Sequence, residues 1–201
     1  EELGGDNASS METIEILEHM AAIDASVAWN VMLGSEINAM AAGGMDPDIA
    51  KEIYLDNPEV IMCGGGGPGG GIPRAEKQPD GSVKVWGQTT FISGCHNADW
   101  CFIGAPLMKG DEPDLDENGM PQFNLWFVPR DQFEILDTWD VAGLRGSGSH
   151  DVKFDGSVVP AKYTGVTLWS VPAHYPNPVY RMPTGLRLAY NKAAIAVGVA
   201  K

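Results

Sequence analysis

The amino-acid sequence predicts an α+β fold, with a central β-barrel or sandwich domain between a helical N-terminal segment and the start of a C-terminal helical bundle. Helical apolar periodicity occupies the first part of the 201-residue chain and returns near its end. Between these parts, short apolar or alternating runs are separated by turn residues, which is typical of successive strands. Strands grouped in this way, with helices before and after them, indicate an α+β class.

Three parts follow from this order. Residues 1–57 are expected to be part of an N-terminal helical domain and residues 58–165 a middle β-domain. Residues 166–201 are expected to form a linker and the first helix of a truncated C-terminal helical domain, because prolines precede a helical pattern that has no stop signal. We therefore interpret the chain as an internal fragment of a longer protein. The linker prolines are Pro172, Pro176, Pro178 and Pro183.

The composition excludes several classes of protein. Hydrophobic residues make up 44% of the chain and charged residues 20%, which is typical of a globular protein. The net charge of -14 argues against nucleic-acid and anionic-membrane partners. The longest apolar runs are too short to span a bilayer. Three cysteines without a secreted spacing pattern indicate a reduced, cytoplasmic protein.

Helical signals open the chain. Ser9 and Glu12 form a capping box, in which each side chain satisfies a backbone amide of the first turn. A break near residues 24–26 divides the pattern that follows into two helices, and Gly43-Gly44 is expected to close the second. Asp46-Pro47 supplies an N-cap and a first-turn proline for a third, short helix.

The stretch from Trp86 to Ala105 organises the middle of the chain. A half-buried strand enters it from Val83 and is broken by Gly94, where a backbone can approach a flat group closely. Residues 100–103 are expected to form a more deeply buried strand. An ordinary hairpin turn is expected at Asp80-Gly81, and further strands at 123–128, 133–136 and 152–159.

Other patterns that suggest chemistry fail on spacing. The glycine-rich stretch 64–71 matches a dinucleotide fingerprint by letter, but a strand and not a helix follows it, so we expect a loop over a site. Adjacent Cys95 and His96 would point to opposite faces of an extended strand. The cysteines lack the paired spacing of a zinc site, and the spacing in the acidic stretch 111–119 lacks the central glycine and the terminal glutamate of an EF-hand. No metal site is expected, and 111–119 is interpreted as a solvated hairpin loop.

Several longer motifs carry a resemblance to a known family. They resemble the middle β-domain of the acyl-CoA dehydrogenase superfamily, and most closely its flavin-dependent monooxygenase branch, the oxygenase components of two-component aromatic hydroxylases. The resemblance extends over nearly the whole chain. Its motifs are Trp86-Gly87, Phe91-Ile92-Ser93-Gly94, Ala98-Asp99-Trp100, the run from Trp139 to Val152, Val158-Val159-Pro160 and Tyr180-Arg181-Met182-Pro183.

The resemblance implies an acyl-CoA dehydrogenase-like fold and a flavin cofactor, either FMN or FAD. It implies a monooxygenase that uses reduced flavin and O2 to hydroxylate an aromatic or polyketide-like substrate. A separate flavin reductase would deliver the reduced flavin, and the full-length protein would be a homotetramer or homodimer. The fragment alone is expected to be inactive, because the family completes its ligand site with helices and a neighbouring subunit.

The resemblance also implies site residues. Ser93 stands at the catalytic position whose hydroxyl hydrogen-bonds flavin N5, and Phe91 takes the place of an aromatic residue that stacks on the ring. The cofactor-binding set implied by the motif positions is Phe91, Ile92, Ser93, Gly94, Cys63 and Gly64, the last two near the pyrimidine side. Arg145, Ser147 and Ser149 lie in a tight loop that is interpreted either as close to the ligand or as a turn between strands.

The sequence leaves two alternative functions open. The first is an acyl-CoA dehydrogenase that oxidises an acyl-CoA thioester with FAD; glycines replace the Thr-Glu-Pro sequence of those enzymes near residue 64, which favours the monooxygenase branch. The second is a non-catalytic β-domain that binds a ligand or a partner chain.

Overall fold

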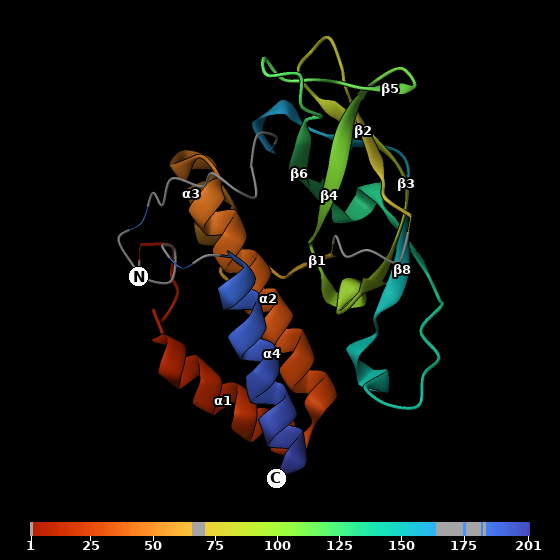
Figure 1. Ribbon diagram of the computed structural model, residues 1–201. Helices are drawn as coiled ribbons and strands as arrows, with labels where there is room; N and C mark the ends of the chain where they lie inside the picture. Colours follow the sequence, from red (N-terminus) through yellow and green to blue (C-terminus); the bar gives the residue numbers. More distant parts are fainter. Residues whose placement is uncertain (1, 66–70, 164–174, 176–181, 183) are drawn as a thin grey trace. The chain divides into compact units, whose positions relative to one another are not determined.

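The computed structural model describes residues 2–65, 71–163, 175, 182 and 184–201 (Figure 1). The chain forms two compact units. The helical unit comprises Glu1–Val60, Asp140–Gly148 and Pro172–Lys201, and the sheet unit comprises Ile61–Trp139 and Ser149–Val171. Most of the predicted glycine loop, most of the proline-rich linker and most of the run from Tyr180 to Pro183 lie outside the described residues.

The helical unit begins with the predicted helices. The Ser9 Oγ accepts the Glu12 amide at 3.3 Å, and a Glu12 carboxylate oxygen accepts the Ser9 amide at 2.8 Å, so the capping box is confirmed. The predicted break is Asp24, which ends the first helix and caps the second. The helices are α1 (Ser10–Ile23), α2 (Ala25–Gly44), α3 (Pro47–Asp56) and α4 (Thr184–Ala200).

The end of α2 differs in detail from the prediction. The helix stops at Gly44 as expected, but its C-cap is Met45 in an extended conformation, with φ -75° and ψ 159°. No left-handed glycine follows the last turn. The next helix starts only three residues later, with Asp46 accepting the Asp48 amide at 2.9 Å, so the chain leaves α2 already extended toward this N-cap.

Helices α1, α2 and α4 pack on one another within the helical unit (Figure 1). Gly198 allows the closest approach, because a Cβ there would overlap the backbone of α1 at Glu18. Glu36 on α2 is buried but paired, since its carboxylate accepts from Asn191 at 3.0 Å and from Lys192 at 3.1 Å. The apolar core consists of Leu17, Ala21, Ala28, Met32, Ala194 and Ile195. In the described ranges, every helix is too short or too polar to traverse a bilayer.

The sheet unit is a curled mixed sheet built around β4 (Trp100–Lys109) (Figure 1). One edge of β4 pairs in parallel with β1 and then β2, and the other pairs antiparallel with β6 and then β5. The remaining strands extend the sheet in the order β2-β3-β8-β7. Their bounds are β1 Met62–Gly65, β2 Arg74–Lys77, β3 Val83–Ile92, β5 Glu112–Pro113, β6 Phe123–Pro129, β7 Glu134–Leu136 and β8 His150–Val159.

The α+β class is confirmed by this architecture. The hairpin at Asp80-Gly81 joins β2 to β3, with Gly81 at φ +85°. The core of the sheet unit is formed by side chains that point to one face of β3, β4, β6 and β8, including Val85, Ile103, Val128 and Phe154. These alternate with exposed positions along β3 and β8, which is why the period-two pattern of the sequence located both strands.

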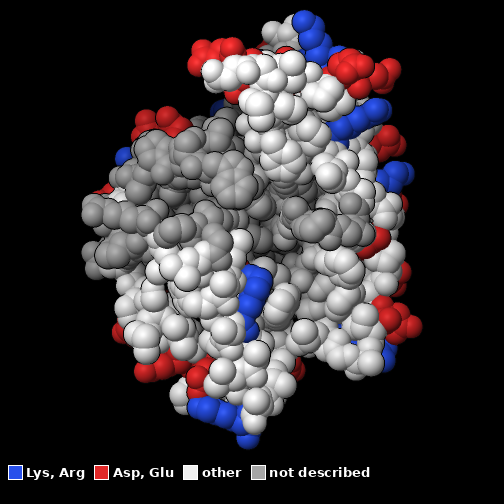
Figure 2. All heavy atoms as spheres, in the orientation of Figure 1, with Lys and Arg blue, Asp and Glu red and all other residues white. Residues whose placement is uncertain are grey.

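The acidic stretch 111–119 is exposed, and its first residues form β5 on the edge of β4. A turn follows in which the Asp116 carboxylate accepts the amides of Asn118 and Met120, at 2.8 and 2.9 Å. Figure 2 shows acidic side chains at the end of the sheet that carries β5. Among the described residues, no three metal-ligating side chains come together.

Candidate functional site

The end of β3 is distorted at Phe91. In a regular strand, Thr89, Phe91 and Ser93 would share one face. Thr89 and Ser93 are buried, but Phe91 is 62% exposed. The cause is a register shift against β8 between Thr89 and Ile92, together with a φ of +61° at Phe91, which a bulky residue rarely adopts. The distortion turns the aromatic ring outward while Ile92 and Ser93 stay in the core.

Ser93 is fixed by a second serine. Its hydroxyl lies 2.6 Å from the hydroxyl of Ser149, and both side chains are at least 94% buried. Ser149 immediately precedes β8, whose residue His150 pairs with Ile92, so the sheet register itself brings the two serines together. Gly94 follows in the left-handed conformation, with φ +73°, and ends the strand as the sequence predicted.

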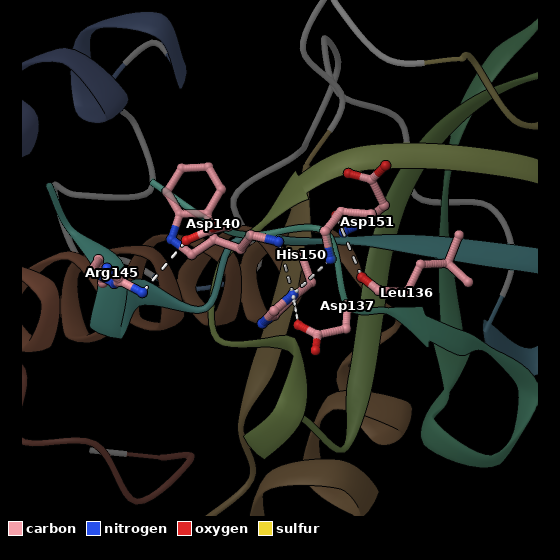
Figure 3. Close-up of polar contacts among 8 residues, drawn as sticks. Leu136, Asp137, Asp140, Arg145, His150 and Asp151 are labelled. Atoms are coloured by element: carbon pink, nitrogen blue, oxygen red, sulfur yellow. Dashed lines mark hydrogen bonds and ion pairs between the residues drawn. The ribbon is translucent and has the colours of Figure 1, made fainter. Parts of the chain in front are cut away.

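Trp139 packs on the exposed ring of Phe91. The two ring centroids are 6.0 Å apart and the planes meet at 87°, an edge-to-face arrangement. Trp139 follows β7 in an irregular segment, residues 137–139, which we call the Trp139 turn. The Thr138 and Trp139 amides of this segment both donate to Nδ1 of His150, at 3.2 Å each (Figure 3). An exposed phenylalanine packed on a half-buried tryptophan, and a buried pair of hydroxyls, thus flank one distorted strand end.

Cys63 and Gly64 lie on β1, where they pair with Cys101 and Phe102 of β4. Both are buried, and the Cys63 thiol belongs to the core of the sheet unit. Its hydrogen bond to Cys101, followed by burial, raises the pKa of the Cys101 thiol. A Cβ on the adjoining Gly65 would lie only 3.0 Å from the end of the Ile92 side chain, so the end of β1 reaches the end of β3.

Cys95 and His96 are separated, but not for the reason that the sequence suggested. They lie in a 3₁₀ helix, Cys95–Asn97, and not on an extended strand. The Cys95 thiol is buried, which raises its pKa to about 11, whereas the exposed His96 ring stacks edge-to-face on His150 at 4.8 Å. A protonated thiol in a core is a packing group and not a nucleophile.

Arg145 and Ser147 belong to the helical unit, in a 3₁₀ helix that follows Leu144 at φ +55°. The Arg145 guanidinium is exposed and lies 3.4 Å from the Asp140 carboxylate (Figure 3). Ser147 is buried. This segment packs on α2. The approach is close at Gly146, where an added Cβ would lie 3.1 Å from the Cβ of Ser26. Of the predicted loop residues, Ser149 belongs to the sheet unit and is hydrogen-bonded to Ser93.

The sequence reasoning missed three contacts: Ser93 with Ser149, Phe91 with Trp139, and His150 with the Trp139 turn. The only available signal was the predicted order of strands, because an antiparallel pair formed by the strands at 83–92 and 150–159 would bring the two serines to the same edge. The left-handed backbone at Phe91 had no signal, since phenylalanine rarely adopts it.

No protein-family model matches the chain. Indole-3-acetate monooxygenase of Acinetobacter baumannii is 29% identical over 197 residues, which cover 98% of this chain and 47% of that enzyme. An FADH2-dependent resorcinol hydroxylase, oxygenase component, of a Rhizobium species is 33% identical over 158 residues, covering 78% of this chain and 36% of that protein. The crystal structure of the HsaA monooxygenase from M. tuberculosis matches with a TM-score of 0.82 and 26% identity, over 98% of this chain and 52% of that one.

The chain is therefore related in sequence and fold to flavin-dependent monooxygenases. It spans about half the length of the first of these relatives and about a third of the second.

Proposed function

We propose that this chain is part of the oxygenase component of a two-component flavin-dependent monooxygenase. The whole protein would use reduced flavin and O2 to hydroxylate an aromatic or polyketide-like substrate. The relatives support this proposal, because they are named as monooxygenases or hydroxylases and one as FADH2-dependent. Within an acyl-CoA dehydrogenase-like architecture, residues 1–57, 58–165 and 166–201 would be parts of the N-terminal, middle and C-terminal domains.

The observation that carries the proposal is the distorted end of β3. A flavin ring is flat and apolar on its faces and polar along the edge that carries N5. Phe91 offers an exposed ring, held against Trp139, and Ser93 offers a hydroxyl two residues away whose position is fixed by Ser149. Backbone strain at a non-glycine residue persists only where the surrounding structure enforces it, and such residues cluster at ligand sites. The residues present therefore fit a flavin.

The bound flavin would supply the oxygen activation and transfer. In that complex, Phe91 would stack against the ring, and the Ser93 hydroxyl would accept the N5 hydrogen and hold that proton in place. Ile92 and Gly94 would hold the end of β3 against the cofactor, and the backbone at Cys63 and Gly64 would bind its pyrimidine side. Water must be excluded around N5, because loss of activated oxygen as peroxide wastes the reductant.

The remaining parts of the proposal concern loops and partners. Arg145 and Ser147 would lie close to the bound ligands through the family position of their loop. The cofactor would be FMN or FAD, delivered by a separate reductase, in a cytoplasmic homotetramer or homodimer. The separate reductase is supported by the relative from Rhizobium, which is named as an FADH2-dependent oxygenase component.

Anaerobic titration of the full-length protein with reduced FMN or FAD tests this function. Saturable binding is expected, followed by O2 consumption and a hydroxylated product with indole-3-acetate or resorcinol and no CoA thioester. Phe91→Leu removes the ring but keeps the strained backbone, so it should weaken flavin binding. Phe123→Leu, at an exposed phenylalanine of β6, should not.

Two results would overturn the proposal. A full-length protein that binds neither flavin would be a non-catalytic binding module. Oxidation of an acyl-CoA thioester by a tightly bound FAD, without O2 consumption coupled to hydroxylation, would identify an acyl-CoA dehydrogenase.

A further inference from the structure

His150 lies beneath the turn that carries Trp139. Its side chain is buried, with the residue only 8% exposed, and its Nδ1 receives the amides of Thr138 and Trp139 at 3.2 Å each (Figure 3). The Thr138 hydroxyl in turn accepts the amide of Asp151, the next residue of β8, at 3.0 Å. Two consecutive residues of β8 therefore hold the turn through three hydrogen bonds.

The Trp139 turn determines where the Trp139 ring lies relative to Phe91. It places the Trp139 ring edge-to-face on Phe91, whose backbone is strained and whose ring is exposed. Backbone hydrogen bonds to Thr138 and Trp139 fix the Cα of Trp139, so the indole has only its two side-chain torsions left to adjust.

We propose that His150 is a positioning residue that holds Trp139 against Phe91 and so shapes the surface on which the flavin ring lies. This inference rests on the proposed function for the flavin, and on the hydrogen bonds at His150 and the Phe91–Trp139 ring contact for the positioning. His150 does not itself touch the ring in this assignment. It acts through the amides of the turn.

Protonation of His150 would release the turn. Nδ1 can accept two amides only when it carries no proton, with the ring proton on Nε2. The same Nδ1 lies 3.2 Å from a carboxylate oxygen of the exposed Asp137, to which a protonated Nδ1 would donate. Nδ1 cannot accept the two amides and donate to Asp137 at the same time. The neutral ring therefore holds the turn, and the charged ring pairs with Asp137.

Other groups face His150 as well. The exposed His96 ring lies edge-to-face at 4.8 Å, and its protonation would disfavour a charge on His150. The Cys95 thiol accepts from the His150 backbone and is protonated at neutral pH. The Asp151 carboxylate is held by Gln88 at 2.8 Å. Asp137 is thus the partner within hydrogen-bond distance of Nδ1 that favours the charged ring.

Fluorine NMR of the full-length protein labelled with 5-fluorotryptophan tests the positioning. The Trp139 resonance is assigned by its loss in Trp139→Phe and followed from about pH 8 to about pH 5, the range in which histidines change charge. In the wild type, the resonance should shift as the pH falls. His150→Asn keeps an acceptor near the Nδ1 position but cannot be protonated, so its resonance should stay at the high-pH position throughout.

His150→Leu and His96→Asn complete the set. His150→Leu removes the acceptor, so the Trp139 resonance should be displaced at every pH. His96→Asn leaves the turn contacts in place, so its resonance should still shift with pH. Oxidised-flavin affinity should fall by about three- to tenfold in His150→Leu, the range that loss of an aromatic edge-to-face contact would give, and should stay within about twofold in His150→Asn.

The outcomes separate the two claims. An equal pH-dependent shift in the wild type and in His150→Asn, or an undisplaced resonance in a folded His150→Leu, overturns the positioning role. If the wild type binds no flavin but Trp139 follows His150 as described, the proposed function fails and the positioning of Trp139 stands. If His150→Leu does not fold, the comparison of wild type with His150→Asn decides alone.

Discussion

The pair of buried hydroxyls on Ser93 and Ser149 gives a prediction that depends on no ligand. The oxygens are 2.6 Å apart, and both side chains are at least 94% buried. Removing one partner of a buried hydrogen bond costs about 1–3 kcal/mol, because the remaining group loses a partner without regaining water. We expect Ser93→Ala and Ser149→Ala each to lower the free energy of unfolding by about 1–2 kcal/mol.

The double variant is the decisive measurement. The double variant should lower the free energy of unfolding by about as much as either single change, which corresponds to a coupling energy of about 1–2 kcal/mol between the two positions. Urea unfolding at fixed pH measures each value, and a shift of about 2–4 °C in Tm per kcal/mol is expected for a chain of this size. Ser157, buried on β8 beside Val85 of β3, is the matched control.

Ser93→Ala combined with Ser157→Ala should be additive, because Ser157 donates to the Gln132 carbonyl whereas the Ser93 hydroxyl pairs with Ser149. If the Ser93 and Ser149 changes are also additive within about 0.3–0.5 kcal/mol, the reasoning is refuted. In the full-length protein, Ser149→Ala should also raise the peroxide released per reduced flavin consumed. Combining it with Ser93→Ala should raise that ratio no further than Ser93→Ala does.

Three further predictions test the backbone, the helix packing and the buried thiols. Phe91→Gly should give a higher free energy of unfolding than Phe91→Ala by about 1 kcal/mol, because glycine adopts φ +61° without strain; equal values would contradict the left-handed backbone. Gly198→Ala should destabilise the chain by about 1–3 kcal/mol through overlap with α1, whereas Gly34→Ala, which meets nothing within 4 Å, should stabilise it by up to about 1 kcal/mol. A Tm measurement in which both alanines act alike would argue against the α1–α4 contact. The pKa of Cys95 is raised by burial to about 11 and that of Cys101 is also raised, so unfolded thiols lose protons near pH 9 while the folded ones keep them. Stability should therefore be fully present below about pH 9 and fall as the pH rises toward 11, and Cys95→Ala should lessen that fall in urea titrations.

The sequence predicted the helices well because their signals are local. The capping box at Ser9, the break at Asp24 and the Asp46-Pro47 start all act within one turn of the residue concerned. A capping side chain accepts a first-turn amide whatever the helix packs against, so these signals can be read without knowledge of the tertiary structure. The same holds for the hairpin at Asp80-Gly81.

The site was less predictable because its contacts join distant residues. Ser93 and Ser149 meet only through the register of β3 with β8, and a slip of one residue would place them on opposite faces. The acceptor role of His150 depends on the path of the turn after β7, which no short motif specifies. The roles of Ser93 and Phe91 toward a flavin came from resemblance and remain proposals.

The distortion at Phe91 explains how one strand end can serve both needs of the proposed site. A regular strand would direct Phe91 and Ser93 to the same face, so both would be buried or both exposed. A stacking ring must be exposed to meet a flat ligand, whereas a hydroxyl that holds one proton must be rigid and shielded from water. The positive φ at Phe91 separates the two side chains, and Ser149 and Trp139 then fix one each. The strained backbone at Phe91 is therefore what the proposed site requires, because a regular strand could not expose the ring and bury the hydroxyl at the same time.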